Sequence, residues 1–437
     1  MPDKISSLND ALDEVKSSSL TLADSPISKR NLFLTNLAAA VEGRGAEILA
    51  ENARDLAEAA GRKVGDAVLD RLRLDQKRLG QLAGSLRETA GLPDPLGSVE
   101  RLSTLPSGLT VGRRRVPLGV VGFICEARPG AAAEAAALAV KSGNALLAKP
   151  GRDSRRTSTL LGGIIGESLA GAGLPRRAVM VLPELNEEQL VYLLSQNDRL
   201  DLVIPRGGEG LVRFVDEHSR VPVLRHYKGV NHLYVDRSAD PDMALDLLVD
   251  GKCDRPSTCN ALECLLVDEA VAGTFLPLAA DELAPRGVSV LGCPKTVAVL
   301  GARGGAGLSL EPAGPGDYGR EFLSLTLAVK VVSGHEEALD HIRAHGSRHT
   351  ECVVTGDLAL ARKFLRRVEA GCVMVNASPR LNDGGCLGLG CEIGISTSKL
   401  HAFGPMGLTE LTTTKFVVEG DGHMRGGGRA PRADAGA

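Results

Sequence analysis

The chain has 437 residues, which at roughly 150 residues per domain predicts two or three domains. It carries 51 basic and 54 acidic residues, and this net charge of −3 does not favour a surface for nucleic acid or anionic membrane. Aromatic residues make up only 3% of the chain, which argues against stacking platforms for single-stranded nucleic acid. The longest apolar runs, such as Val116–Cys125, are shorter than the ~18 residues that span a bilayer, and the N-terminus lacks the apolar segment of a signal peptide. We therefore expect a cytoplasmic globular protein without a membrane or nucleic-acid partner.

Nine cysteines are scattered along the chain and form no C-x-x-C pair. Such a set is typical of reduced cytosolic thiols, so we exclude a disulfide framework but not the chemistry of a single thiol. No H-E-x-x-H, G-x-S-x-G, G-x-G-x-x-G or G-x-x-x-x-G-K-[ST] motif occurs. His335 and His341 lie six residues apart, on different faces of a predicted helix, and we expect them to be solvated or helix-capping. We expect no metal site.

The first 90 residues have helical periodicity. Apolar residues recur at spacings of three and four, at Leu8, Leu12 and Val15 and again over Leu32–Val41. Pro26 follows a serine and signals a helix start. A set of N-terminal helices is therefore expected.

A hairpin and then an alternation of strands and helices follow. Pro106, Ser107 and Gly108 form a turn sequence between two apolar runs, Leu102–Leu105 and Leu109–Val116. The alternation predicts a parallel sheet with crossover helices, in a first α/β unit that ends near Val235. Its expected elements are strand Val116–Ile124, helix Ala131–Ser142, strand Ala145–Lys149, helix Ser158–Ala170, strand Val179–Leu182, helix Glu187–Ser195, strand Leu202–Ile204 and helix Leu211–Glu217.

A second α/β unit repeats the pattern, and the chain from His423 onward is poor in apolar residues and expected to be disordered. The expected elements of the second unit are helix Pro241–Cys253, strand Ala261–Asp268, helix Ala270–Leu283, strand Thr296–Leu300, a loop over 301–319, strand Leu325–Val332, helix Glu336–His345, strand Glu351–Thr355, helix Leu358–Val368 and strand Gly371–Val375.

Two segments of the first unit have the chemistry of anion binding. Gly207 and Gly208 lie between a strand and a helix, where bare backbone N–H groups at a helix N-terminus stabilise an anion. The alternative is a tight turn without a ligand. Lys149 ends another strand, at the edge of a parallel sheet where ligands bind, and its alternative is a solvated strand-end lysine.

Cys259 is the best candidate for a nucleophile. It lies in a polar turn with Arg255 and Asn260, between a helix and a buried strand, and a nearby guanidinium lowers the pKa of a thiol. Cys264 lies inside the strand and is better interpreted as a small buried hydrophobe. Cys253, at a helix end, is a weaker rival.

A third candidate segment is the glycine-rich and hydroxyl-rich run over residues 376–398. Such a loop after a strand can close over a ligand, and the alternative is a surface loop with no ligand.

Taken in order, these segments resemble the gamma-glutamyl phosphate reductases of proline biosynthesis, a family of the aldehyde dehydrogenase superfamily. The resemblance covers about residues 32–422 and is carried by RVPLGVVGFICEARPG (115–130), DLVIPRGGEGLVRFV (201–215), DRPSTCNALECLLV (254–267), HTECVVTGD (349–357) and LGCEIGISTSKLHAFGPMGLTELTTTKFVVEGDG (389–422).

The resemblance implies an α/β fold like that of aldehyde dehydrogenases. It has a dinucleotide-binding parallel-sheet domain at 1–100 and 119–235, and a catalytic α/β domain at 236–398. A small β oligomerisation flap is expected at 101–118 and 399–422, which implies a homo-oligomer, and the disordered tail is expected at 423–437.

The same resemblance implies roles for residues that bind the cofactor, NADPH. Gly207 and Gly208 match the turn that faces the cofactor phosphates, and Lys149 matches a lysine that could accept the 2′-phosphate. Glu321 lies near the E-x-F position that bonds the nicotinamide ribose, although Leu323 stands where that motif has Phe.

Cys259 falls on the nucleophile of the family. Its thiolate would displace phosphate from L-glutamyl 5-phosphate to form a thioester, which hydride reduces to L-glutamate 5-semialdehyde, the second step of proline biosynthesis from glutamate. The oxyanion would be stabilised by the Cys259 N–H and a side-chain amide. Gly130 replaces an Asn or Asp common in the family, which leaves Asn260 and Asn376 as candidates for that amide.

Three arginines are candidates for the carboxylate and phosphate of the substrate, because guanidinium pairs bidentately with such groups. They are Arg128, Arg255 and Arg380. The acyl phosphate is expected from a separate glutamate kinase. Two alternatives remain: an aldehyde-oxidising enzyme, disfavoured because residues 224–231 contain no Asp or Glu to activate water, and a catalytically silent homologue, disfavoured by the intact cysteine turn.

Overall fold

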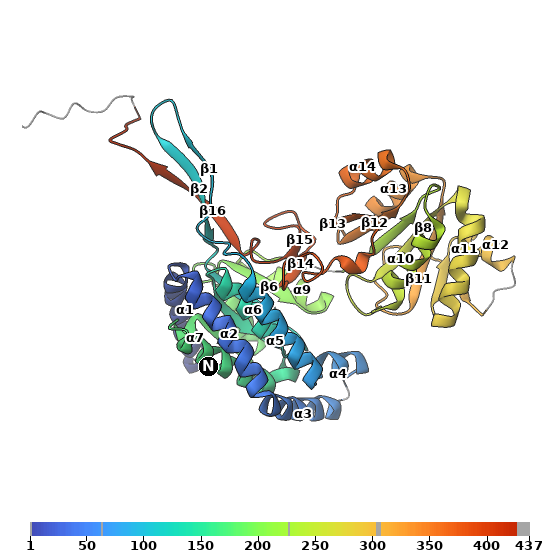
Figure 1. Ribbon diagram of the computed structural model, residues 1–437. Coiled ribbons are helices and arrows are strands. Elements are labelled where there is room, and N and C mark those ends of the chain that lie inside the picture. Colours follow the sequence, from blue (N-terminus) through green and yellow to red (C-terminus); the bar gives the residue numbers. More distant parts are fainter. Residues whose placement is uncertain (1, 63, 226–227, 303–306, 426–437) are drawn as a thin grey trace, which may run out of the picture. The chain divides into compact units, whose positions relative to one another are not determined.

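The computed structural model describes residues 2–62, 64–225, 228–302 and 307–425 (Figure 1). The chain forms two compact units, each of which is described by itself. The first contains the described parts of residues 1–204, 218–223 and 407–437, and the second contains those of residues 205–217 and 224–406. No described helix is both long enough and apolar enough to span a bilayer.

The first unit begins with helices, as predicted. Leu8, Leu12 and Val15 are buried, and Phe33 and Leu37 are fully buried in the second helix. Leu32, which the spacing also placed on the apolar face, is instead 46% exposed. The five helices are α1 (Pro2–Ala23), α2 (Ile27–Gly43), α3 (Gly45–Gly61), α4 (Asp66–Leu72) and α5 (Gln76–Gly91).

A four-stranded sheet in the order β5-β4-β3-β6 forms the centre of the first unit. Strands β3, β4 and β5 run parallel, as the alternation predicted. The elements are β3 (Val120–Cys125), α6 (Ala131–Lys141), β4 (Ala145–Lys149), η1 (Arg152–Ser154), α7 (Arg155–Gly171), η2 (Arg176–Ala178), β5 (Val179–Val181), α8 (Glu187–Leu194) and β6 (Leu202–Arg206). The next helix, α9 (Glu209–His218), was expected in the first domain but lies in the second unit except for its last residue.

Strand β3 begins four residues later than the apolar run suggested, because the chain turns at Gly119. This glycine has φ +132, and a Cβ there would lie 2.1 Å from Oδ2 of Asp201. The same oxygen accepts a hydrogen bond of 2.7 Å from the Val120 N–H and one of 3.0 Å from Lys16. The Asp201 carboxylate therefore fixes the first residue of the strand.

The predicted hairpin is part of a separate three-stranded antiparallel sheet, which Figure 1 shows as a narrow arm. Its strands are β1 (Val99–Thr104), β2 (Thr110–Pro117) and β16 (Thr412–Glu419), with β2 in the centre. Phe416 and Val418 are more than half exposed on β16. Residues 399–406 do not join this sheet, which corrects the expected start of the second flap segment.

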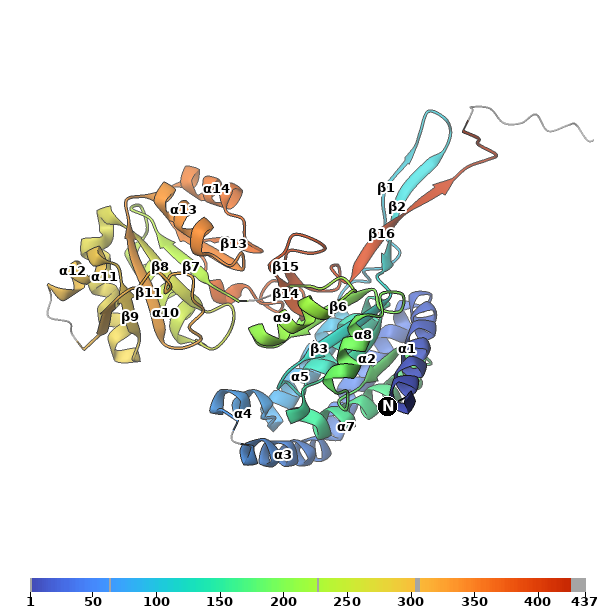
Figure 2. The ribbon, with the colours of Figure 1, turned by 180° about the vertical axis from the view of Figure 1, so that it is seen from behind.

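The second unit is a seven-stranded parallel sheet with helices on both faces (Figure 2). Alternate residues of each strand pack on opposite faces, so that Leu265 contacts the cluster of α10–α12 and Leu266 that of α13 and α14. The strand order is β10-β9-β11-β8-β7-β12-β13. The elements are β7 (Asn231–Val235), α10 (Pro241–Cys253), β8 (Leu262–Asp268), α11 (Glu269–Leu283), η3 (Ala284–Arg286), β9 (Ser289–Gly292), α12 (Pro294–Gly301), β10 (Ser309–Pro312), β11 (Thr326–Val332), α13 (His335–His345), β12 (Thr350–Val354), α14 (Leu358–Arg367), β13 (Cys372–Val375) and η4 (Pro379–Leu381).

The loop expected over 301–319 contains strand β10, and two further expectations for this unit were also wrong. Strand β7 pairs with β8 and β12, so Asn231–Val235 belongs to the second sheet and the first unit ends before it. The segment expected as strand Thr296–Leu300 is helix α12, because Cys293 caps it by accepting a hydrogen bond from the Thr296 N–H and Pro294 occupies its first turn.

A two-stranded antiparallel sheet, β14 (Gly394–Ser396) and β15 (Gly404–Met406), completes the second unit. It contains the residues that were expected to begin the flap. Most of the predicted disordered tail, residues 426–437, lies outside the described residues.

Candidate active site

The predicted nucleophile lies in the turn that links α10 to β8 in the second unit. The Thr258 N–H donates to the Arg255 carbonyl (3.2 Å), and the Ala261 N–H donates to the Thr258 carbonyl (3.0 Å). Cys259 is half-buried on this turn, whereas Cys264 is buried in β8. Burial raises the pKa of the rival thiol, Cys253, above its ordinary value. Cys253 and Cys259 are both half-buried, and the raised pKa of Cys253 leaves Cys259 as the better candidate for a nucleophile.

Asn260 is buried and anchors the turn. Its Nδ2 donates to the carbonyls of Arg380 and Asn382, both at 3.1 Å. Its Oδ1 accepts hydrogen bonds from Thr258 Oγ1 (2.9 Å) and from the Arg380 guanidinium. Both ends of the amide are thus used within the protein, which makes Asn260 a support of the cysteine turn.

Arg380 also bonds to the turn. Its guanidinium donates to Thr258 Oγ1 at 2.9 Å and pairs with Asp254 Oδ2 at 3.1 Å. The guanidinium side chain is only 16% exposed, whereas that of Asp254 is 56% exposed. By contrast, Arg255 is exposed beside Cys259 and has no ion pair or side-chain hydrogen bond within the described part of the chain. Of the two, Arg255 is the one available to an anionic ligand.

The main chain of Cys259 contacts the first residue of β7 and the segment before it, a connection that sequence reasoning missed. Asn231 Nδ2 donates to the carbonyls of Cys259 (2.8 Å) and Ala261 (2.6 Å). Gly229 lies so close that a Cβ there would be 1.9 Å from the Cys259 carbonyl oxygen. Only glycine can occupy position 229 without moving the nucleophile.

Glu321 is bonded to the same segment. Its Oε1 accepts a hydrogen bond of 2.8 Å from the Gly229 N–H. Burial raises the pKa of Glu321, and the charge of Glu209, in the first turn of α9, raises it further. The predicted ribose-binding carboxylate and the predicted nucleophile therefore both contact Gly229.

The two glycine-rich segments are also joined in this unit. Gly207 and Gly208 are exposed immediately before α9, as a phosphate-binding turn requires. Arg206 donates to Glu392 Oε1 at 3.3 Å, and Glu392 Oε2 accepts from the Gly384 N–H at 3.1 Å. Glu392 thus connects the loop over 376–398 to the turn at 206–208.

Asn376, a candidate for holding the acyl oxygen, is bonded elsewhere. Its Oδ1 accepts from the Thr355 N–H (2.9 Å), and its Nδ2 donates to the Thr355 carbonyl (3.0 Å). The side chain therefore bridges the ends of β12 and β13.

Lys149 and Arg128 belong to the first unit, at the carboxyl ends of β4 and β3. Lys149 is partly buried, and this burial lowers its pKa, an effect opposed by Cys125 and Glu126. Arg128 is exposed in the connection between β3 and α6. Gly151 packs against this connection, since a Cβ there would lie 3.2 Å from the Ala127 nitrogen. Both cations thus lie at one edge of the first sheet.

The expectation that His341 is solvated was wrong. It is 4% exposed on α13, and its Nε2 lies 3.7 Å from Cys264 Sγ. His232, Cys264 and His341 place three possible metal-ligand atoms within 4.8 Å of one another. However, the Lys330 ammonium lies 3.5 Å from His341 Nδ1, and the Glu351 carboxylate, despite burial, raises the pKa of His232. Both cationic groups have carboxylate partners within the protein, at 2.8 Å for His232 and Glu351 and at 3.0 Å for Lys330 and Glu337, so the cluster is part of an ion-pair network.

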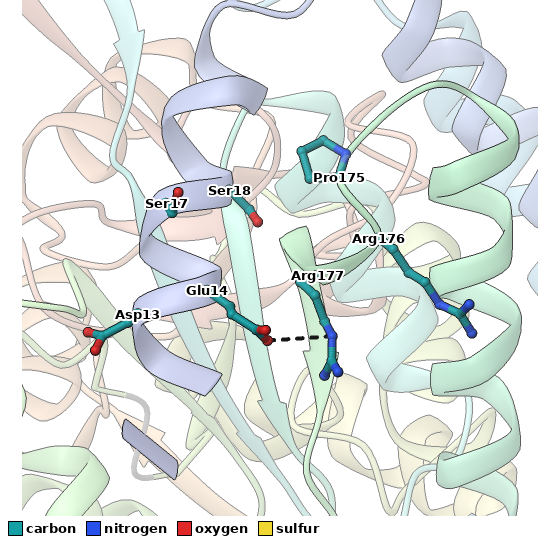
Figure 3. Close-up of a pocket in the computed structure, with 7 residues that line it drawn as sticks. All are labelled: Asp13, Glu14, Ser17, Ser18, Pro175, Arg176 and Arg177. Carbon is teal, nitrogen blue, oxygen red and sulfur yellow. Dashed lines mark ion pairs between the residues drawn. The ribbon is translucent and has the colours of Figure 1, made fainter. Parts of the chain in front are cut away.

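A surface depression of about 440 Å³ lies in the first unit, beside α1 and the η2 segment (Figure 3). Arg177 and Glu14 form an ion pair of 3.5 Å across it. None of the predicted site residues lines it.

Comparison with known sequences adds independent evidence. A sequence model of the aldehyde dehydrogenase family matches residues 6–288, more than half of the chain. A gamma-glutamyl phosphate reductase from Anaeromyxobacter sp. (strain Fw109-5) is 53% identical over 386 residues, which cover 88% of this chain and 90% of the relative. One from Meiothermus ruber is 48% identical over 396 residues, which cover 91% and 93% of the two chains.

Solved structures agree. The crystal structure of gamma-glutamyl phosphate reductase from Thermotoga maritima matches with a TM-score of 0.91 and 38% identity, over 96% of this chain and 99% of that one. An acetylating aldehyde dehydrogenase from Geobacillus thermoglucosidasius matches with a TM-score of 0.71 over 97% and 98% of the chains. At 18% identity, the second match shows a shared fold.

Proposed function

Since this chain belongs to the aldehyde dehydrogenase family, and within it to the gamma-glutamyl phosphate reductases, we propose that it reduces L-glutamyl 5-phosphate to L-glutamate 5-semialdehyde and phosphate with NADPH. This is the second step of proline biosynthesis from glutamate. The observation that carries the proposal is the half-buried thiol of Cys259, on a turn that shares Gly229 with the Glu321 carboxylate.

The covalent chemistry begins at Cys259. Its thiolate sulfur attacks the acyl carbon, the bond from that carbon to the phosphate oxygen breaks, and phosphate leaves with the electron pair. When bound, NADPH would supply the hydride that converts the resulting thioester to a thiohemiacetal anion. The carbon–sulfur bond of the thiohemiacetal then breaks, which releases the aldehyde and regenerates the thiolate at Cys259. Reduction in this direction needs no water, which fits the lack of a carboxylate in residues 224–231.

The turn residues support the thiol, and the main chain of the turn supplies the donor for the oxyanion. We assign to the Cys259 backbone N–H the stabilisation of the developing negative charge. Asn260 acts by holding the turn, because both ends of its amide are bonded to protein groups. Arg255 is our principal candidate for a substrate anion, with Arg128 and Arg380 as further candidates.

The residues present suit a phosphorylated dinucleotide. The exposed residues Gly207 and Gly208 precede α9, whose N-terminus would hold the pyrophosphate, and Glu321 would accept from a ribose hydroxyl. Lys149 would pair with the 2′-phosphate that distinguishes NADPH from NADH. We further propose a cytoplasmic homo-oligomer, joined through the arm of β1, β2 and β16, that receives its acyl phosphate from a separate glutamate kinase.

The reverse reaction tests this function, because it avoids the labile acyl phosphate. Purified protein with NADP⁺, phosphate and glutamate semialdehyde should generate the absorbance of the reduced nicotinamide. Cys259→Ser should lower that rate by at least about a thousandfold, whereas Cys372→Ser, in strand β13 and outside the glycine-rich loop, should leave it within about twofold. Full activity in Cys259→Ser would refute the thioester. Turnover of other aldehydes but not of glutamate semialdehyde would refute the substrate.

A further inference from the structure

The buried ion pair between Lys252 and Glu263 encloses the cysteine turn. Lys252 is in the last turn of α10 and Glu263 is in β8, seven residues before and four residues after Cys259. Their side chains are 0% and 1% exposed, and Lys252 Nζ lies 2.7 Å from Glu263 Oε2. Lys252 also donates to the Leu262 carbonyl at 2.8 Å. The ion pair therefore connects the end of α10 to the start of β8, the two elements that flank the Cys259 turn.

The second oxygen of Glu263 is bonded to the loop that carries Glu321. Glu263 Oε1 accepts a hydrogen bond of 3.1 Å from the Leu323 N–H. Leu323 has φ +54, a left-handed conformation that is strained for a leucine and needs support. The Lys252 ammonium also lies 6.0 Å from the centroid of the Phe322 ring. The ion pair thus fixes residues 322 and 323, directly after Glu321.

These contacts link Cys259 to Glu321 in two ways, through Glu263 and through Gly229. On one side, the main chain leads from Cys259 to Glu263, which bonds to the Leu323 N–H, two residues after Glu321. On the other side, Glu321 accepts from the Gly229 N–H, and Gly229 packs against the Cys259 carbonyl. Each link is a direct contact or a short stretch of main chain within the second unit, so a shift at Glu263 moves the loop that carries Glu321 relative to the thiol.

Stability alone does not explain an ion pair at this place. Burial lowers the pKa of Lys252 and raises that of Glu263 to about 7, which shows the cost of removing both charges from water. A hydrophobic pair of similar volume is usually at least as stable as a buried ion pair. A carboxylate, unlike an apolar side chain, can bond to both Lys252 and the Leu323 N–H.

We propose that Lys252 and Glu263 are positioning residues that set the Cys259 turn against the loop carrying Glu321, and thereby align the thioester carbon with the nicotinamide. This role rests on the proposed function, and it is not catalytic in the narrow sense because neither side chain reaches the reacting atoms. Its loss should slow hydride transfer and leave the reactivity of the thiol intact.

Two variants test the proposal. Glu263→Asp keeps the charge beside Lys252 but is one methylene too short to bond to both partners. The double variant K252M/E263M removes both charges, so that no unpaired buried charge remains. A matched control, K295M/E269M, removes the exposed pair of Lys295 and Glu269 (2.8 Å) in the same unit.

We expect kcat to fall while the reactivity of the Cys259 thiol is unchanged. Both test variants should lose about ten- to a hundredfold in kcat and should raise the KM for NADP⁺, because Glu321 shifts, with the rate of Cys259 alkylation by iodoacetamide within about twofold of wild type. Hydrogen exchange at residues 321–323 should accelerate in both variants and not in the control. Should the double variant fail to fold, Glu263→Asp alone decides.

Wild-type kcat in a folded Glu263→Asp protein, or unchanged hydrogen exchange at residues 321–323, would overturn the proposal. The exchange measurement does not depend on substrate, so it separates failure of the positioning role from failure of the proposed function. An inactive wild type would refute the function, and accelerated exchange in the variants would still support the link from Glu263 to the loop.

Discussion

Gly229→Ala is the substitution whose effect the structure determines most directly. The new Cβ would lie 1.9 Å from the Cys259 carbonyl oxygen and 2.9 Å from its carbonyl carbon. Since real Cβ contacts are essentially never under 3.0 Å, the oxygen must move by at least about 1.1 Å, or the strand that begins at Asn231 must move by as much. Both atoms belong to main chain, so no flexible side chain can absorb the shift.

This displacement reaches the nucleophile because the same carbonyl accepts the 2.8 Å hydrogen bond from Asn231. A misplacement of about 1 Å at reacting groups can cost about a hundredfold in rate, or about 2.7 kcal/mol of transition-state stabilisation. The Gly229 N–H also donates to Glu321, so the loss should appear in kcat and in the KM for NADP⁺.

The assay is NADP⁺ reduction with glutamate semialdehyde and phosphate, combined with circular dichroism and thermal unfolding. Gly273→Ala is the matched control: it lies on α11, and a Cβ there meets nothing within 4 Å. The control should keep full activity and gain up to about 1 kcal/mol in stability from helix propensity. A folded Gly229→Ala enzyme with activity within twofold of wild type would refute the argument that this contact positions Cys259.

Three further outcomes follow from other contacts. Lys149→Met should abolish the preference for NADPH over NADH in kcat/KM. Because burial lowers the pKa of Lys149, the wild-type preference should weaken as the pH rises and the ammonium loses its charge. A preference that stays constant with pH would contradict this role. Arg380→Ala should lower kcat about tenfold or more, whereas Asp254→Asn, which removes an exposed partner, should change it less than about fivefold; equal effects of both would contradict the turn-holding role. Gly119→Ala should lower the melting temperature by several degrees, because its Cβ would lie 2.1 Å from Oδ2 of Asp201; an unchanged melting curve would contradict that geometry.

Local signals in the sequence predicted most of the elements. Apolar spacing identified the N-terminal helices, and the alternation of strands and helices identified the two parallel sheets. The failure at 296–300 shows the limit of composition, because Thr-Val-Ala-Val-Leu suits a strand by its β-branched residues. The deciding signal was the Cys293-Pro294 pair before it, which caps and begins a helix.

The assignment of strand β7 to a sheet could not be made from local sequence. Asn231–Val235 is buried throughout, as the strand of either unit would be. Its place between β8 and β12 depends on partners that follow it by 27 or more residues in the chain. Pairing across such distances is a property of the whole fold, and periodicity within one segment contains no information on it.

The candidate site likewise contains features set by neighbouring residues and features set by contacts between distant segments. The turn around Cys259 could be predicted because its polar residues are neighbours in sequence. The interactions that position it could not, since Gly229 precedes Cys259 by 30 residues and Leu323 follows Glu263 by 60. At Gly229 the sequence shows only a flexible residue, and the 1.9 Å approach that makes glycine necessary exists only in the fold.

Arg380 shows why residue type alone does not assign a role. A guanidinium pairs with a carboxylate or phosphate of a substrate, and that chemistry made it a candidate for substrate binding. In the fold the same donors are bonded to Asp254, Thr258 and Asn260, which are groups of the protein itself. The two roles predict different kinetics: removal of a group that binds the substrate raises KM, whereas a displaced turn lowers kcat. Because the guanidinium is already paired, the structure favours the second result for Arg380 and leaves the exposed Arg255 as the arginine whose replacement should raise KM.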